Sequence, residues 1–494
     1  MSEKAIYLDH AATSLPKPES VITAVTEGLR HAGNGSRGAY EAANWSGERL
    51  FRARLAFSRA FAVGDPSRVI FTHNASESLN LSLFGAIPPG ARVLAEVSAH
   101  NSILRPLHAL AKQRGIQVDF VLPRKDGRFF IEDFAAALQP DTRFFVFSHA
   151  SNLSGNLNDL AAFGNFAHEH GLFFIVDAAQ TAGLVPIDLQ AMHIDCLCIT
   201  GHKSLLGPQG TGLLCLGPGV ELEPLKYGGT GSHSHSADMP EDYPDHLEAG
   251  TLNTPGICGL AAGLAEIQSQ GMEQLFTRGL ALAKMFYEGL REIPGIEFYG
   301  DYAETSARVP IVTLNLPRMD AARAADLLST EWQIACRSGI HCAPRMHDFF
   351  GSSDRGSLRF SFAASNTEEE IEKAIQAVKI LANLEGSIPR LTAKEHHDKV
   401  VKNLSNNLKK IYQSKKFSEI KLYQLKDRDF KVIYSMQKTP DIDPSTILDK
   451  EFKRKYTKKE VYNIKNEFKK YISTNELNAL FKGKIKQISL GMER

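Results

Sequence analysis

Short apolar runs that alternate with helix-like segments dominate residues 16–255, and they constrain the fold more than any other feature of the chain. Unbroken apolar runs of this length are typical of strands buried on both faces of a parallel sheet, with crossover helices between them. We therefore predict an α/β fold in which helices wrap a mostly parallel, seven-stranded sheet. The expected strands are Arg68–Thr72, Arg92–Glu96, Val118–Val121, Phe144–Ser148, Leu172–Val176, Ile194–Ile199 and Gly212–Leu216.

A second pattern begins near Pro255. A long helical segment, Gly256–Arg291, leads into a mixed region that contains the apolar run Val309–Leu314 and ends in a helical pattern over Glu368–Leu384. We interpret residues 16–255 as a large domain. Residues 1–15 and 256–385 are expected to form a smaller α+β domain.

The charge of the chain changes abruptly near residue 390. Residues 391–494 carry a net charge of +12, whereas residues 1–390 carry −11, and only two of the 38 glycines lie in the last part. We predict a linker at 386–390, followed by a basic α+β extension over 391–494. In that extension, helices are expected at 394–412, 458–472 and 476–488, and a hairpin is expected from the strands 419–425 and 430–435.

Composition excludes several classes of protein. No apolar run is long enough to span a membrane, and the first residues lack the apolar stretch of a signal peptide. Six cysteines in 494 residues form no disulfide framework, so we expect a cytoplasmic protein. The cysteines and histidines show no zinc-ligand spacing, so no metal is expected; the His/Ser-rich segment 229–235 is interpreted as a loop.

Two strand ends carry chemically important side chains. Asp177 follows the run Leu172–Val176, and Thr200-Gly201-His202-Lys203 follows Ile194–Ile199. In parallel sheets, ligands lie just beyond the carboxyl ends of the strands. A carboxylate and a lysine at that edge suit pyridoxal 5′-phosphate (PLP): the lysine forms a Schiff base, and the carboxylate pairs with the pyridinium nitrogen. Taken singly, Lys203 equally fits a solvated loop, and Asp177 fits a helix N-cap.

Several motifs, in this order along the chain, resemble the class V aminotransferase family. They are Tyr7–Thr13, Asp177–Gln180, Gly201–Lys203, Glu248–Thr251 and Arg337–Ala343. Within the family they resemble the cysteine desulfurases with a short cysteine loop, and the resemblance covers residues 5–385. It implies the fold type I architecture of PLP enzymes, a homodimer with active sites at the subunit interface, and a role in sulfur transfer such as iron–sulfur cluster assembly.

The resemblance also implies a set of cofactor contacts. Lys203 would hold PLP and shuttle a proton, Asp177 would pair with the ring nitrogen, and Gln180 would donate to the phenolate oxygen. His100 would stack on the ring and pass protons. The phosphate would be bound by Ala75 and Ser76 at a helix N-terminus, where free N–H groups and the helix dipole favour an anion. Further donors would be Thr200, His202 and, from the neighbouring subunit, Thr251.

Substrate contacts follow from the same resemblance. Asn152, Arg337 and Arg359 would hold the amino acid, with Arg359 forming a bidentate pair with its α-carboxylate. Cys342 would attack the substrate sulfur as the thiolate, with Arg337 and His341 as sources of positive potential. Cys336 is assigned to packing.

The expected activity is that of a cysteine desulfurase, which converts L-cysteine to L-alanine and passes a persulfide on Cys342 to a sulfur-acceptor protein. A selenocysteine lyase is the alternative, because Ile340 stands where many relatives carry a polar residue. The basic part 391–494 has no counterpart in the family. Its charge fits binding to RNA or to an acidic acceptor protein, and its composition equally fits a structural module or a fusion.

Overall fold

The computed structural model describes residues 5–35, 38–383, 419–426 and 429–437. The chain divides into two compact units, Met1–Ile388 and Pro389–Arg494, which are described separately. The boundary between the two units lies within the segment 386–390.

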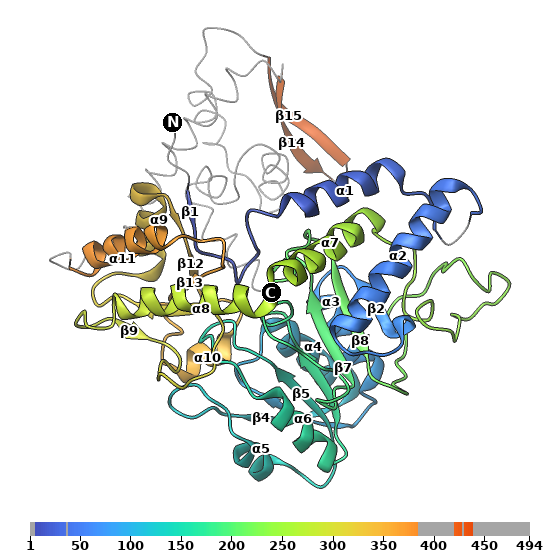
Figure 1. The fold of residues 1–494 in the computed structure, drawn as a ribbon, viewed down its shortest axis with the longest axis horizontal. Helices are drawn as coiled ribbons and strands as arrows, with labels where there is room; N and C mark the ends of the chain where they lie inside the picture. The colour runs from blue at the N-terminus through green and yellow to red at the C-terminus, as the bar shows by residue number, and fades with distance from the viewer. Residues whose placement is uncertain (1–4, 36–37, 384–418, 427–428, 438–494) are drawn as a thin grey trace. The chain divides into compact units, whose positions relative to one another are not determined.

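A seven-stranded sheet forms the centre of the first unit (Figure 1). The strand order is β2-β8-β7-β6-β5-β3-β4, and β8 is antiparallel to both of its neighbours while the other pairs are parallel. This confirms the predicted mostly parallel sheet. The strands are β2 (Val69–Thr72), β3 (Arg92–Glu96), β4 (Gln117–Val121), β5 (Thr142–Ser148), β6 (Phe173–Asp177), β7 (Cys196–Thr200) and β8 (Gly212–Leu216).

Helices pack on both faces of this sheet because both faces of its central strands are apolar. One face is covered by α2 (Glu41–Ala60), α5 (Ile131–Ala137), α6 (Leu160–Glu169) and α7 (Thr254–Gln270), the other by α3 (Ala75–Ala86) and α4 (Asn101–Arg114). The first face contains an aromatic cluster in which Phe145 stacks on Phe174 at 4.9 Å and Phe147 contacts Phe163 at 4.3 Å between ring centroids. α1 (Glu19–His31) packs against α7.

A smaller antiparallel sheet of order β12-β13-β10-β9 lies beside the large one in Figure 1. Its strands are β9 (Glu297–Phe298), β10 (Ile311–Asn315), β12 (Arg337–Gly339) and β13 (Ser357–Ser361), and its core includes residues of α8 (Met272–Glu288), α9 (Ala321–Trp332) and α11 (Glu368–Ala382). The N-terminal strand β1 (Ile6–Tyr7) pairs in parallel with β11 (Ile334–Ala335). Ile6 and Leu8 are buried in this second core.

The helical segment expected over 256–291 is two helices, so the expectation of one continuous helix is wrong. Gly271 separates α7 from α8 with φ +84, a left-handed conformation that glycine adopts without strain. The His/Ser-rich segment 229–235 has no helix or strand, as expected of a loop.

The described part of the second unit is a hairpin. Strands β14 (Glu419–Lys426) and β15 (Asp429–Gln437) pair antiparallel from Glu419 opposite Gln437 to Lys426 opposite Asp429, which confirms the predicted hairpin. The helices predicted at 394–412, 458–472 and 476–488 lie outside the described residues.

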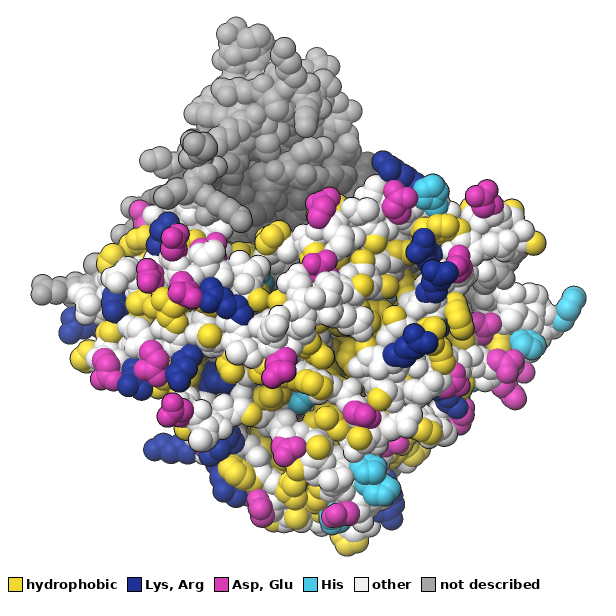
Figure 2. All heavy atoms as spheres, in the orientation of Figure 1, with side chains coloured by type: hydrophobic (Ala, Val, Ile, Leu, Met, Phe, Trp, Pro, Cys, Tyr) yellow, Lys and Arg dark blue, Asp and Glu magenta, His cyan; other side chains and the backbone are white. Residues whose placement is uncertain are grey.

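The described surface carries charges of both signs. In Figure 2, Lys and Arg are interspersed with Asp and Glu over the visible face of the described part. Within the described residues, none of the helices combines the length and the apolar character that crossing a bilayer requires. The same residues contain no cluster of three or more His, Cys, Asp or Glu that could hold a metal ion.

Candidate functional site

A cavity of about 220 Å³ lies beyond the carboxyl ends of β5, β6 and β7, the edge at which the sequence places a ligand. It brings together most of the predicted site residues, although they come from positions far apart in the sequence. Cys342 and Thr251 are the predicted residues that do not line it. The predicted residues that line it are Ala75, Ser76, His100, Asn152, Asp177, Gln180, Thr200, His202, Lys203, Arg337 and Arg359.

Asp177 and Lys203 reach this cavity from adjacent strands. Burial raises the pKa of Asp177, and the positive charge of Lys203 opposes that shift. Burial is the main cause that lowers the pKa of Lys203 to about 8; the negative charge of Asp177 opposes it, and Arg359 and Arg337 add to it. An amine with this pKa is partly neutral near physiological pH, and the neutral form is the one that attacks an aldehyde.

The two simpler interpretations of these residues are wrong. Asp177 accepts a hydrogen bond from the amide of Ala179 at 2.9 Å, but residues 179–184 form turns and no helix begins there. Lys203 lines the cavity and is half-buried, so it is not a solvated loop residue.

The N-terminus of α3 faces the cavity through Ala75 and Ser76. Asn74 caps this helix, because its side chain accepts from the amide of Glu77 at 3.0 Å. The amides of the first turn have no partner within the helix, and the helix dipole adds positive potential, so this end suits an anion such as a phosphate.

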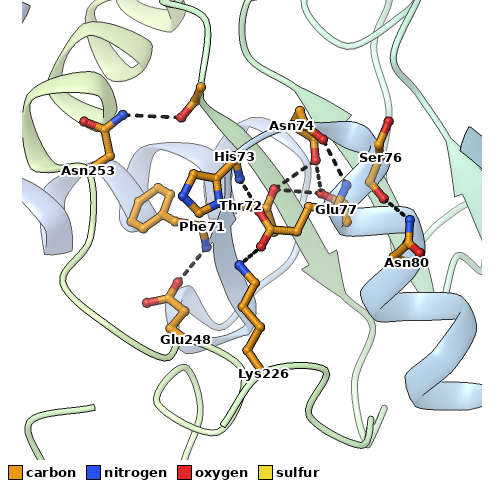
Figure 3. Close-up of polar contacts among 12 residues, drawn as sticks. Phe71, Thr72, His73, Asn74, Ser76, Glu77, Asn80, Lys226, Glu248 and Asn253 are labelled. Atoms are coloured by element: carbon orange, nitrogen blue, oxygen red, sulfur yellow. Dashed lines mark hydrogen bonds and ion pairs between the residues drawn. The ribbon is translucent and has the colours of Figure 1, made fainter. Parts of the chain in front are cut away.

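Figure 3 shows a second layer of polar contacts behind this helix end. Glu77 accepts from both the backbone amide and Nδ1 of His73 at 2.6 Å, and Lys226 donates to its other oxygen. Lys226 and His73 thus compensate an acidic side chain that would otherwise repel an anion at the same helix end. Sequence reasoning missed this cluster, because Lys226 lies 149 positions from Glu77.

His100 is the N-cap of α4, where its Nδ1 accepts from the amide of Ser102 at 3.1 Å. Burial, together with the smaller effects of the positive charges of Lys203, Arg337, Arg359 and Arg105, lowers the pKa of His100 to about 4. The ring is therefore neutral near pH 7. Because Nδ1 accepts, Nε2 carries the hydrogen and is the atom that can donate a hydrogen bond.

Several buried polar atoms of the cavity lack a hydrogen-bond partner among the described residues. They are the hydroxyl oxygens of Ser98, Ser148 and Thr200, Nδ1 of His202 and Nε of Arg359. Buried groups without partners are costly, so they are expected to meet a ligand rich in oxygen. Together with the lysine, the facing carboxylate and the helix N-terminus, they fit PLP and a carboxylate-bearing substrate.

Arg359 and Arg337 lie directly opposite each other on the antiparallel strands β13 and β12. Arg359 is 1% exposed; it donates to Asp9 at 3.0 Å and to the backbone oxygen of Asn152 at 3.0 Å. Two arginines on facing strands repel each other, which favours an anion between them. The side-chain amide of Asn152 donates to the backbone oxygen of His341 at 2.7 Å, so Asn152 also holds the cysteine loop.

Cys342 lies in a tight loop that follows β12. Gly339, His341 and Cys342 all have positive φ, of +112, +51 and +58. Such conformations are strained for residues other than glycine and persist where surrounding contacts hold them. Asn101, the residue after His100, donates its amide to the Cys342 oxygen at 2.8 Å, which fixes the half-buried cysteine beside the helix that His100 caps.

The expectation that His341 supplies positive potential to Cys342 is wrong. His341 is buried, and its Nε2 donates to the backbone oxygen of Ser357 at 3.0 Å. Burial, together with the smaller effect of the nearby Arg359, lowers the pKa of His341 to about 2, so the ring is neutral. Arg359 and Arg337 remain as the sources of positive charge.

Cys336 packs against the hydrophobic core beside the smaller sheet, and burial raises its pKa to about 12. A thiol with that pKa is not ionised near neutral pH, and only the thiolate is strongly nucleophilic. The packing role assigned to Cys336 agrees with this position.

Thr251 is exposed and lines a separate, smaller cavity of about 60 Å³ with Lys226 and Glu248. Glu248 is buried and anchors the preceding loop: it pairs with Arg54 at 2.5 Å and accepts from the amide of Phe71 at 2.6 Å (Figure 3). Thr251 is therefore held outward, away from the main cavity of its own chain.

Glu96, at the end of β3, is a buried acidic residue that sequence reasoning missed. One carboxylate oxygen accepts from the amide of Ser148 at 3.0 Å, and the other has no partner among the described residues. Burial raises the pKa of Glu96 to about 8, with a smaller contribution from Asp177. The group is therefore mostly protonated at pH 7. In the sequence it looks like an ordinary polar strand end.

This protonation makes stability depend on pH. The unfolded chain ionises Glu96 above its ordinary pKa of 4.5, whereas the folded chain keeps the proton up to about pH 8. Between these values the folded state binds more protons, so the contribution of Glu96 to stability falls as the pH rises. A Glu96→Gln variant has no proton to lose at this position. Its stability relative to wild type is therefore expected to rise by about 1.4 kcal/mol per pH unit.

Thermal melting of both proteins from pH 5 to pH 8 measures this difference. Glu169→Gln, at an exposed position on α6, is the matched control and should show a constant difference. A constant difference for Glu96→Gln would show that Glu96 is ionised in the folded protein.

Comparisons with known proteins identify the family of the chain. A family model described as aminotransferase class-V matches residues 6–374. A probable cysteine desulfurase of Methanothermobacter thermautotrophicus is 32% identical over 386 residues, which cover 77% of this chain and 95% of the relative. A cysteine desulfurase of Haloferax volcanii is 31% identical over 394 residues, which cover 76% of this chain and 88% of the relative.

Solved structures of similar fold are also named as cysteine desulfurases. The apo structure of a cysteine desulfurase from Thermococcus onnurineus has a TM-score of 0.71 and 28% identity, and the match covers 76% of this chain and 94% of that one. The cysteine desulfurase CsdA of Escherichia coli, in an S-sulfonic acid form, has a TM-score of 0.70 and 28% identity, with 77% and 95% covered.

Proposed function

The chain belongs to the class V aminotransferase family, and we propose that it is a PLP-dependent cysteine desulfurase. One observation carries the proposal. Lys203 faces the buried Asp177 at the sheet edge, and the buried Arg359 lies in the same cavity while Cys342 is fixed beside the helix that His100 caps. The relatives and solved structures of similar fold are cysteine desulfurases.

PLP, when bound, supplies an electron sink that labilises the α-proton of an amino acid and weakens its Cβ–S bond. Lys203 would hold the aldehyde carbon through Nζ and would move a proton at the α-carbon of the substrate. Asp177 would keep the ring nitrogen charged, and the second amide hydrogen of Gln180 is available for the phenolate oxygen, because the first is bound to Ala11 at 3.2 Å. Ala75 and Ser76 would bind the phosphate, and Thr200 and His202 would add donors.

Arg359 and Arg337 bind the α-carboxylate of the substrate, and Asn152 borders it. The neutral His100 lies on the cavity wall, where its Nε2–H can donate a hydrogen bond to the substrate. An arginine pair of this kind, with Arg359 buried and Arg337 half-buried, selects amino acids by their carboxylate rather than by their side chain. The choice of a sulfur substrate therefore depends on Cys342.

Cys342 collects the sulfur. Its thiolate attacks the substrate sulfur, so that an S–S bond forms while the Cβ–S bond breaks. The electron pair of the broken bond passes to Cβ, which takes up a proton. The α-carbon takes back the proton that it lost, so that alanine is formed and the persulfide remains on Cys342. An acceptor or a reductant then removes the outer sulfur.

The test is to mix the purified protein with L-cysteine and dithiothreitol and to quantify both products. Alanine and sulfide are expected in equal amounts. Pyruvate formed in place of alanine, or no product at all from protein that contains PLP, would contradict the proposal.

Two further features complete the proposal. We infer a homodimer in which Thr251 reaches the phosphate site of the second copy, because Thr251 is held outward from its own cavity. A purified protein that sediments as a monomer would exclude this arrangement. We also place the enzyme in the cytoplasm, with a protein as sulfur acceptor, whereas RNA binding by residues 391–494 stays an untested alternative.

A further inference from the structure

Four donors from one short segment converge on the backbone oxygen of His202, the residue that precedes Lys203. They are Thr13 Oγ1 at 3.0 Å, the Ser14 amide at 3.0 Å, the Ser14 hydroxyl at 3.2 Å and Lys17 Nζ at 2.9 Å. A carbonyl oxygen has two lone pairs, so this one is saturated with donors. We call residues 13–17 the N-terminal clamp.

Lys17 is the charged member of the clamp. Its Nζ also donates to the Ser14 hydroxyl at 2.7 Å, so the ammonium group is turned inward although the neighbouring Leu15 is 50% exposed. Burial lowers the pKa of Lys17 to about 8. The ammonium group thus loses part of its hydration when it binds the His202 oxygen. In return, a hydrogen bond from a charged donor is stronger than one from a neutral donor.

The clamped peptide bears the cofactor lysine. The amide of Leu206 donates a hydrogen bond to the backbone oxygen of Lys203 at 2.9 Å. The amide of Gly207 likewise donates to the backbone oxygen of Gly201 at 2.9 Å. These bonds shape the turn that follows β7. They leave the His202–Lys203 peptide to be oriented by the N-terminal clamp.

The segment before the clamp is tied to the other side of the cavity. Asp9 contacts Arg359 at 3.0 Å, and the amide of Ala11 donates to the Ser361 hydroxyl at 2.8 Å. Residues 9–17 therefore run between the substrate arginine on β13 and the cofactor lysine after β7. In this position, residues 9–17 can fix the distance between Arg359 and Lys203.

We propose that Lys17, together with Thr13 and Ser14, is a positioning residue that orients the peptide of Lys203 and holds a positive charge at the backbone oxygen of the residue before it. The proposal rests on the proposed function only in taking Lys203 as the lysine that holds PLP. A positive charge near the lysine–cofactor linkage disfavours its protonation. Below about pH 8, where Lys17 itself is charged, removing that charge should therefore raise the pH at which the linkage loses its proton.

The test uses the full-length protein loaded with PLP. The visible absorbance of the bound cofactor is titrated from pH 6 to pH 10 in wild type, Lys17→Met and Lys17→Arg. Lys17→Met is expected to move the midpoint upward by about half a pH unit or more, and to weaken PLP binding several-fold. Lys17→Arg keeps the charge and a donor, and should stay within a few tenths of a unit of wild type.

Two controls separate the outcomes. Lys373→Met removes a charge from an exposed position on α11 and should titrate like wild type. Thr13→Val removes a neutral donor and should weaken PLP binding without moving the midpoint. An unchanged midpoint and unchanged PLP affinity in Lys17→Met would overturn the proposal. Absence of any visible band in wild-type protein incubated with PLP would instead contradict the proposed function.

Discussion

A Cys342→Ala variant is expected to lose L-cysteine desulfurase turnover by on the order of 100-fold or more, because it removes the atom that receives the sulfur. Binding of PLP should not change, since Cys342 does not line the cofactor cavity. Alanine production under saturating L-cysteine measures the loss, and the visible absorbance of the cofactor confirms that the site is intact.

Cys336→Ala is the matched control, because Cys336 lies six positions earlier and packs against the hydrophobic core beside the smaller sheet. It should keep its turnover. Full turnover by Cys342→Ala would refute the assigned nucleophile. Assays with selenocysteine distinguish a cysteine desulfurase from a selenocysteine lyase. Because selenium leaves more readily than sulfur, Cys342→Ala should lose much less activity with selenocysteine than with cysteine if both are substrates.

A Lys203→Ala variant is expected to abolish turnover below detection, on the order of 1,000-fold or more, because it removes both the covalent anchor of the cofactor and the base that moves the α-proton. Its visible absorbance should resemble that of free PLP. Cofactor affinity should fall without vanishing, since the α3 N-terminus and the unpartnered hydroxyl groups of the cavity still contact the phosphate and the ring.

Lys112→Ala, at an exposed position on α4, is the control for the loss of a lysine and should behave like wild type. Turnover retained by Lys203→Ala would mean that another amine holds the cofactor. The half-buried Lys17 would be the first candidate, as its pKa is also lowered to about 8.

The sequence is a good guide to the sheet and to the residues at its edge. The strands from β2 to β8 follow from apolar runs, because a strand buried on both faces needs apolar residues at successive positions. Asp177 and Lys203 meet because parallel strands deliver their carboxyl ends to one edge. The motif resemblance supplies the other lining residues, such as His100 and Arg359.

Contacts that depend on tertiary structure could not be predicted from the sequence. The clamp on the His202 oxygen joins residues 185 or more positions apart, and nothing local to Lys17 predicts it. Burial decides the protonation of Glu96 and of His341, and neither residue looks unusual in the linear sequence. The division of one expected helix into α7 and α8 depends on the positive φ of Gly271, a residue that is also tolerated inside helices.

The central claim is that Lys203 carries the cofactor, and borohydride reduction followed by peptide mapping tests it most directly. Reduction converts the linkage between PLP and its lysine into a stable amine, so the labelled lysine can be located by mass spectrometry. We expect the visible band to disappear and the mass of reduced PLP to lie on the peptide that contains Lys203. A label on any other lysine, or unlabelled protein after reduction in excess PLP, would contradict the account.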